Sequence, residues 1–217
     1  YPGMRPAGGA VDGGIERIRG AAGPQTHFGS DHRTFAAGGD GDDYLSGGGG
    51  DDRLSGDAGD DVLIGGVGDD LIFGGGGNDH LRAGGGRDIV LDASGDEQYV
   101  LEPLAGRTRL LDFGGKDTLT IGGSGVEPED LTFGRERGDL LVEVNDGRTL
   151  AVKHFFSNPR FRIERIALED GRMLEAERID AHLAHLAATA AWAHDTAPAS
   201  TPDGTMESDL SWLLPLA

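Results

Sequence analysis

The feature that most constrains this chain is a nine-residue repeat between residues 38 and 91. The segment divides into six consecutive units, GGDGDDYLS, GGGGDDRLS, GDAGDDVLI, GGVGDDLIF, GGGGNDHLR and AGGGRDIVL. In every unit the fourth position is glycine, the sixth is aspartate and the eighth is apolar. A fixed short period predicts a stacked architecture, in which each unit buries its apolar residue against its neighbours.

Composition excludes several classes of protein. The chain carries 38 acidic and 19 basic residues, a formal net charge of −19, which disfavours nucleic-acid binding. It has no cysteine, so disulfides, thiolate metal sites and cysteine nucleophiles are excluded. No apolar run approaches the ~18 residues of a membrane span. Of the 39 glycines, 19 lie in residues 38–91, so the glycine belongs to the repeat.

Each repeat position has a physical role. Glycines at positions one, two and four permit the positive φ angles of a tight turn. Aspartate at position six ends the turn, and residues seven to nine form a short strand whose eighth side chain points to one face. Two units make one turn of a flattened parallel coil with loops on opposite edges, so six units predict three turns. The alternative is a disordered acidic linker, but such a linker would not need an apolar residue at the eighth position of every unit.

The candidate ligands are carboxylate and carbonyl oxygens, without histidine or cysteine, which favours a hard cation. Ca²⁺ accepts six to eight oxygens in flexible geometry, whereas Mg²⁺ demands stricter octahedral geometry. An EF-hand is excluded because Leu45 stands where its glycine belongs. A phosphate-binding loop is excluded because Gly115-Lys116 is followed by Asp117 rather than Ser or Thr.

The units match the pattern G-G-x-G-x-D-x-U-x and resemble the RTX (repeats-in-toxin) calcium-binding family. The resemblance implies an all-β fold, a right-handed parallel β-roll (β-solenoid) with a β-rich C-terminal cap and one α-helix. It also implies ions between successive loops on one edge, held by two position-six aspartates and by carbonyls near positions two and four. The pairs are Asp43 with Asp61, Asp61 with Asp79, Asp52 with Asp70 and Asp70 with Asp88.

These pairs predict four Ca²⁺ ions. A decayed seventh unit at Asp92–Val100, with Gly95 and Glu97 in the key positions, adds a fifth if Glu97 faces Asp79. The unit Gly29–Ala37 has Thr34 in place of the acid, and no regular site is expected there. The predicted ligand residues, besides the six aspartates and Glu97, supply carbonyls: Gly39, Gly41, Gly48, Gly50, Asp57, Gly59, Gly66, Gly68, Gly75, Gly77, Gly84 and Gly86.

Residues 98–171 change character and predict a β-rich cap. Strands are expected at Gln98–Leu101, Arg109–Phe113, Thr118–Ile121, Asp130–Phe133, Leu140–Val144, Thr149–Phe155 and Phe161–Leu168, with hairpin turns at 145–147 and 169–171. Phe155 and Phe156 are interpreted as core, with a ligand site as the alternative. This segment resembles the flank that follows RTX blocks in large secreted proteins, especially the last block of the adenylate cyclase toxins.

The other segments are less informative. Residues 1–37 form a lead-in in which His27 and His32 are expected to be solvated, and 38–97 form the roll. Residues 172–194 predict a helix with Ile179 and Leu183 on one face. His182 and His185 on it are a solvated pair or, alternatively, metal ligands. Residues 195–217 predict a flexible tail, whose apolar end is a type I secretion signal or an anchor strand.

The sequence predicts a calcium-binding module at the C-terminus of a larger secreted protein, with a toxin as the first expectation. Such a module is disordered without Ca²⁺ and folds outside the cell. The expected partners are the type I export machinery and a host cell surface, and the expected state is a monomer. The alternative is a Ca²⁺-dependent receptor- or carbohydrate-binding module of an adhesin or hydrolase. No nucleophile or paired acid accompanies His154, so no enzyme is predicted.

Overall fold

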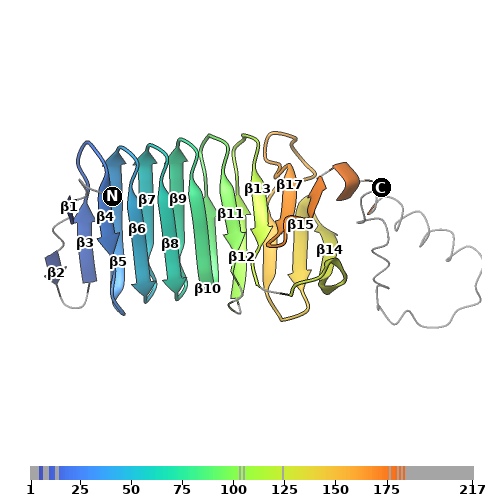
Figure 1. Cartoon of the computed structure of the whole chain (residues 1–217), viewed down its shortest axis with the longest axis horizontal. Coiled ribbons are helices and arrows are strands. Elements are labelled where there is room, and N and C mark those ends of the chain that lie inside the picture. Colours follow the sequence, from blue (N-terminus) through green and yellow to red (C-terminus); the bar gives the residue numbers. More distant parts are fainter. Residues whose placement is uncertain are drawn as a thin grey trace, which may run out of the picture.

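The computed structural model describes residues 5–6, 10–12, 15–102, 104, 106–123, 125–175, 177–179, 181 and 183. These residues form a parallel β-solenoid that is long and flattened, with successive strands stacked along its long axis (Figure 1). The predicted all-β parallel roll is confirmed. Within the described part of the chain, no helix has the length and apolar character needed to cross a membrane.

Two parallel sheets form the faces of the solenoid. Sheet one contains β1 (Arg5–Pro6), β4 (Gln25–Phe28), β6 (Tyr44–Gly49), β8 (Val62–Val67), the start of β10 (His80–Leu91), β11 (Gln98–Leu101), β13 (Thr118–Ile121) and β17 (Arg165–Leu168). Sheet two contains β3 (Ile15–Arg19), β5 (Arg33–Asp40), β7 (Arg53–Ala58), β9 (Leu71–Gly76), the end of β10, β12 (Gly106–Leu111) and β16 (Thr149–Val152).

The core is a double column of apolar side chains between the sheets. The eighth residue of each repeat points inward and is at most 3% exposed: Leu45, Leu54, Leu63, Ile72, Leu81 and Val90. Pairing places each directly beside the equivalent residue of the next turn, as Leu45 lies beside Leu63 and Leu63 beside Leu81. Burying one such side chain contributes about 1.5–3 kcal/mol to the stability of the fold. The apolar eighth position of the repeat therefore supplies the core of the roll.

The coil extends beyond the predicted boundaries at residues 37 and 97. In sheet one the inward column continues through Tyr99, Leu119 and Ile166, and in sheet two through Leu110 and Val152. The roll therefore has more than the three predicted turns. The reason is that a parallel coil requires only an inward apolar residue on a strand of suitable length. The glycine and aspartate signature marks a special loop and not the ends of the coil.

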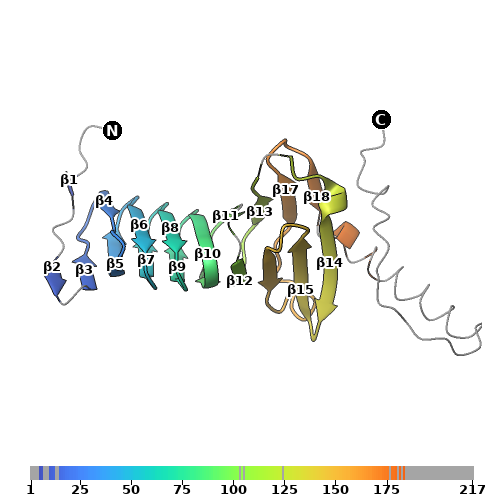
Figure 2. The ribbon, with the colours of Figure 1, turned by 90° about the horizontal axis from the view of Figure 1, so that it is seen from below.

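Antiparallel hairpins cover both ends of the roll (Figure 2). At the C-terminal end β15 (Asp139–Val144) pairs with β16 and with β14 (Leu131–Glu136), which follows the 3₁₀ helix Pro128–Asp130. Strand β18 (Met173–Glu175) pairs with β17, and β2 (Ala10–Asp12) pairs with β3 at the other end. The predicted hairpin turns at 145–147 and 169–171 are confirmed. These hairpins cover the end strands of the sheets, whose unpaired backbone groups could otherwise pair with another chain.

Several element boundaries differ from the predictions. The strand predicted at Arg109–Phe113 lies at 106–111, and those predicted at Thr149–Phe155 and Phe161–Leu168 are shorter, at 149–152 and 165–168. Tight turns occupy the residues between, since the N–H groups of Ser157 and Asn158 both donate to the carbonyl of His154. Strand β17 begins only where Arg165 comes into register with Thr118.

The start of the predicted helix at 172–194 is also wrong. Residues 173–175 are strand, because the 169–171 turn leads into the hairpin with β17, and helix is described at 177–179, 181 and 183. Ile179 is fully buried and Leu183 packs against the core, which confirms the predicted apolar face. His182, His185 and the predicted tail at 195–217 lie outside the described residues.

A buried arginine ties the cap to the end of the roll. The guanidinium of Arg148, 1% exposed, donates to the carbonyl oxygens of Leu101 (3.0 Å) and Gly122 and to the carboxylate of Asp146. Its donors thus reach carbonyls just at and beyond the ends of β11 and β13, of which that of Leu101 also accepts from the N–H of Gly122 at 2.9 Å. A charge at this depth is stable only with such partners.

Candidate metal centre

The position-six aspartates form two buried columns, one along each edge of the roll. Five of the six come directly before a strand, Asp88 lies within β10, and successive members of a column are eighteen residues apart. One column contains Asp43, Asp61 and Asp79, and the other contains Asp52, Asp70 and Asp88. None is more than 2% exposed. The structure therefore brings together all four aspartate pairs that the sequence predicts.

A directional hydrogen-bond ladder links each column. The backbone N–H of Asp43 donates to Oδ1 of Asp61 at 2.7 Å, and the N–H of Asp61 donates to Oδ1 of Asp79 at 2.8 Å. In the other column Asp52 and Asp70 donate in the same way to the next aspartate, at 2.8 and 3.1 Å. Each ladder fixes the orientation of the carboxylates and leaves their second oxygen free to bind something else.

That second oxygen is the strongest indication of a cation. The Oδ2 atoms of all six aspartates are buried and accept no hydrogen bond. An unsatisfied buried polar atom costs about 1–3 kcal/mol, and more if it is charged. A hard cation between the turns would satisfy these oxygens and cancel the charge. The donor set, carboxylates beside closely spaced carbonyls, fits Ca²⁺.

The pKa values show the electrostatic cost of these columns. Burial raises the pKa of Asp61 and of Asp70 to about 7, and neighbouring carboxylates add to the effect, whereas backbone N–H donors oppose it. Burial likewise raises the pKa of Asp52 and Asp88 to about 6. Desolvation favours the neutral acid, so a bound cation must compete with protons near neutral pH.

The loop backbone places carbonyl oxygens between the turns. Residues at positions two and four have positive φ in every unit, including Asp57 at 75°. Their carbonyls face the next turn, since a Cβ added at Gly59 would overlap the carbonyl of Gly41. The predicted carbonyl ligands thus lie where ions between loops would need them. Coordination by those carbonyls remains a prediction.

The role predicted for position one is wrong. None of these glycines has a positive φ. A side chain is excluded there because a Cβ at Gly38 or Gly56 would overlap the carboxylate of Asp43 or Asp61 in the same unit. The position-one glycine therefore makes room for the ligand, whereas those at positions two and four form the turn.

The ends of the columns carry different groups. The N–H of Gln25 donates to Asp43, and the N–H of Thr34 donates to Asp52 at 2.6 Å, so neutral residues take the place of the acid there. At the other end, Glu97 is 1% exposed, and its N–H donates to Oδ1 of Asp117 at 2.9 Å. The pairing of Asp79 with Glu97 lacks this hydrogen bond in the described structure, and it remains a prediction.

Sequence reasoning missed three buried acids near Glu97, namely Asp92, Asp112 and Asp117. A signal was present. Counting from Asp112 places Gly115 at position four, Asp117 at position six and Leu119 at position eight. The unit was not predicted because it begins twenty residues after the start of the seventh unit, whereas units on one edge of the roll otherwise recur every eighteen residues.

Other predicted side chains have simpler roles. His27 is 7% exposed and occupies an inward position beside Leu45, so the expected solvation is wrong. Its pattern position, equivalent to an eighth residue, explains the burial, and burial lowers its pKa despite Glu16 nearby. His32 is exposed. Phe155 is 1% exposed and packs edge-on against Phe156, which favours the core interpretation.

Comparison with known proteins identifies the class of these repeats. Residues 28–63 and 55–90 match the model of the RTX calcium-binding nonapeptide repeat. The matched stretch coincides with the columns of buried aspartates. The matched repeats are thus of a type that binds calcium, and the structure folds them as a parallel β-roll. No curated protein matches the chain.

Proposed function

We propose that this chain is a calcium-folded export and folding module of a larger secreted protein. The observation that carries the proposal is the pair of columns in which every aspartate keeps one buried oxygen without a partner. We assign the ions to the spaces between aspartates of successive turns, about four or five in all, with the glycine carbonyls completing the shells.

Without the ion, the columns place six buried carboxylates close together along two edges. Their mutual repulsion and desolvation oppose folding, and the small inward residues of the repeats offset only part of that cost. The chain is therefore disordered at low calcium, and the binding free energy becomes folding free energy. Cytosolic calcium is low and extracellular calcium about millimolar, so low-affinity sites fill only outside the cell.

This behaviour suits export through a narrow channel. The chain passes the type I export machinery unfolded, guided by the C-terminal tail, and folds as a monomer on emergence. Refolding outside prevents it from sliding back. The host protein is most simply a toxin, in keeping with the resemblance of the flank to the last block of adenylate cyclase toxins, and no catalytic role is assigned to this module.

A calcium titration followed by far-UV circular dichroism tests the proposal. The whole chain in chelated buffer is expected to lack strand signal and to gain it cooperatively as Ca²⁺ is added. Mg²⁺ at the same concentrations serves as the control and is expected to have little effect. A strand signal that persists unchanged in chelator would contradict folding on calcium binding.

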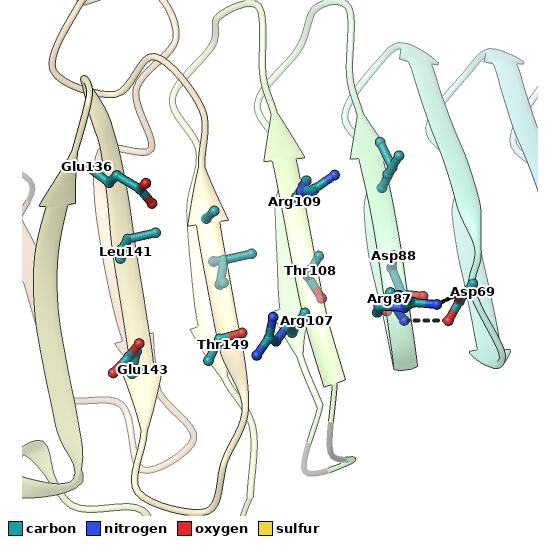
Figure 3. A pocket seen from close by; sticks show the side chains of 13 residues that line it. Asp69, Arg87, Asp88, Arg107, Thr108, Arg109, Glu136, Leu141, Glu143 and Thr149 are labelled. Atoms are coloured by element: carbon teal, nitrogen blue, oxygen red, sulfur yellow. Dashed lines mark hydrogen bonds and ion pairs between the residues drawn. The ribbon is translucent and has the colours of Figure 1, made fainter.

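A second candidate function is Ca²⁺-dependent binding to a cell surface, receptor or carbohydrate. A groove of about 590 Å³ runs over the outer face of sheet two, where the roll meets the cap. Figure 3 shows that Arg107 and Arg109 from β12 face it from one side, with Glu136 and Glu143 from the β14–β15 hairpin on the other. Both arginines are exposed, so the groove offers charged donors and acceptors to a polar ligand.

A cell-binding or glycan-binding assay in calcium separates the two functions. Binding of the isolated chain that is lost on replacing Arg107 and Arg109 with alanine would favour the surface-binding function. Secretion and calcium-dependent folding that are unaffected by the same replacements would favour the export module.

A further inference from the structure

A cluster of buried carboxylates lies at the junction of the roll and the cap. Carboxylate oxygens of Glu97, Asp112 and Asp117 lie within 4.8 Å of one another, and no residue of the three is more than 1% exposed. Glu97 comes directly before β11, Asp112 directly after β12 and Asp117 directly before β13. Acidic side chains at the ends of three different strands therefore lie together in one place that is buried from solvent.

The oxygens in this cluster are unsatisfied. Both carboxylate oxygens of Glu97 and one of Asp117 are buried and accept no hydrogen bond. Burial raises the pKa of Glu97 to about 10, and the neighbouring acids Asp117, Asp92 and Asp112 contribute. Placing charges this close and this deep is strongly unfavourable unless a cation or protons compensate them.

One member is held in place by the core. The hydroxyl of Tyr99, an inward residue 3% exposed, donates to Oδ2 of Asp112 at 2.7 Å, and the N–H of Gly114 donates to Oδ1 at 2.6 Å. Asp117 is fixed by the N–H of Glu97. The N–H of Asp117 donates in turn to the carboxylate of Glu164. These contacts fix the orientation of the carboxylates in the folded chain.

The cluster differs from the regular sites. Gly38, Gly56 and Gly74 occupy position one along this edge, and their lack of a side chain leaves room for the position-six carboxylate. In the two turns that follow, position one is Asp92 and then Asp112. The junction thus gains a carboxylate that the repeat pattern does not contain.

We propose that Glu97, Asp112 and Asp117 form a separate calcium site that joins the roll to the cap. The choice of Ca²⁺ follows from a donor set of oxygens alone and rests on the proposed function. Three carboxylates converge on one ion here, whereas each regular site has two position-six aspartates, and Asp61 and Asp70 are each shared between two neighbouring spaces. Affinity rises with the charge of the ligand set, so this site holds the tightest ion and loses it last on chelation.

Equilibrium dialysis of the whole chain with radioactive Ca²⁺ tests the site. Asp112→Asn keeps an oxygen for the N–H of Gly114, places an NH₂ group beside the hydroxyl of Tyr99, which can accept from it, and removes the charge. This variant is expected to lose one ion per chain, the tightest. Asp96→Asn is the matched control, because Asp96 is exposed beside Glu97 and accepts only from the N–H of Lys116 among the described hydrogen bonds. The control is expected to retain every ion.

The outcomes separate this site from the proposed function. If the parent chain binds no Ca²⁺, the proposed function fails. If the parent binds Ca²⁺, Asp61→Asn binds less and Asp112→Asn matches the parent in number and affinity, only the junction site is overturned.

Tyr99→Phe covers the case in which Asp112→Asn does not fold. It removes one hydroxyl and leaves the three carboxylates. We expect about tenfold weaker binding of the tightest ion in competition with a chelator, as for the loss of one hydrogen bond to a charged group. An unchanged chelator midpoint in Tyr99→Phe would overturn the site as drawn.

Discussion

The backbone N–H of Asp61 donates to the carboxylate of Asp79, eighteen residues later, while the carboxylate of Asp61 accepts from the N–H of Asp43 at 2.7 Å. Each aspartate therefore belongs to two successive turns of the roll. An ion bound on one side of Asp61 orders a carboxylate that also serves the other side. Calcium binding along an edge is consequently expected to be cooperative.

Replacing Asp61 with asparagine tests this sharing. Asp61→Asn keeps an oxygen for the N–H of Asp43 but removes the charge from two neighbouring sites. The calcium concentration at the folding midpoint is expected to rise about tenfold, because the charge of the ligands sets affinity. The transition is expected to be shallower, because Asp61 links two neighbouring sites. Circular dichroism across a calcium titration measures both quantities.

Asp60→Asn is the control. Asp60 is exposed, and its Oδ1 accepts from the N–H of Asn78, an interaction that the asparagine oxygen preserves. This variant should fold at the calcium concentration of the parent. Equal shifts in Asp60→Asn and Asp61→Asn would show that general surface charge, not the buried column, governs the midpoint.

The pH dependence of calcium binding follows from the raised pKa values of the columns. Asp61 and Asp70 have a pKa of about 7 in the folded, metal-free roll and about 4 when unfolded. Calcium must displace these protons, so the calcium midpoint is expected to increase as the pH falls from 8 to 5.5. Proton release on binding, followed by calorimetry in buffers of different ionisation enthalpy, measures the exchange.

The same shifts predict the opposite trend for the metal-free fold. Because the pKa of each carboxyl is raised on folding, its contribution to stability is present below about pH 4 and lost as pH rises through about 7. Calcium-free chain should therefore show more strand signal at pH 5 than at pH 8. A metal-free signal that increased with pH would contradict burial of neutral acids in the columns.

The sequence could predict those parts of the fold whose interactions recur at a fixed spacing. The inward apolar residues and the paired aspartates recur every nine residues, so Leu63 and Asp61 could be placed from the pattern. Tyr99, Leu110 and Ile166 continue the same core without the glycine and aspartate signature, so the extent of the coil could not be predicted. Strand pairing across tens of residues decides it, as between Thr118 and Arg165.

The same limit applies to the site. The columns could be predicted because their spacing is constant. The approach of Asp112 to Glu97 depends on how the coil continues after the regular repeats end, and the burial of Arg148 depends on how the cap folds back onto the roll. Neither follows from local periodicity, since the partners of Arg148 lie 47 and 26 residues away.

Alanine substitutions separate the two kinds of glycine in the loops. Gly68 has φ +140°, and a side chain there would overlap the carbonyl of Gly50 in the previous turn. Gly68→Ala is expected to lower the free energy of unfolding in saturating calcium by about 2 kcal/mol or more, from backbone strain and lost room. Urea unfolding of the variant measures the loss.

Gly76→Ala provides the comparison from the same type of loop. A Cβ at Gly76 would have only the hydroxyl of Ser94 nearby, at 3.6 Å, and its φ lies outside the left-handed region. This variant is expected to change stability by less than about 0.5 kcal/mol. Similar losses at Gly68 and Gly76 would mean that general chain flexibility, and not contact between turns, explains the glycines.

The buried arginine offers a test of how the cap is attached. Arg148→Met keeps much of the side-chain volume but removes the guanidinium hydrogen bonds to the carbonyls of Leu101 and Gly122, and leaves Leu101 with only the N–H of Gly122. The expected loss in saturating calcium is about 3 kcal/mol, since two buried hydrogen bonds from a charged donor are lost and the Gly122 carbonyl is left without its described partner. Arg148→Lys should lose less, because its ammonium can still donate to one of the carbonyls, although it cannot reproduce the planar fork. Arg160→Met, at an exposed position, should stay within about 0.5 kcal/mol of the parent. If Arg148→Met unfolds at the same urea concentration as Arg160→Met, this arginine does not anchor the cap.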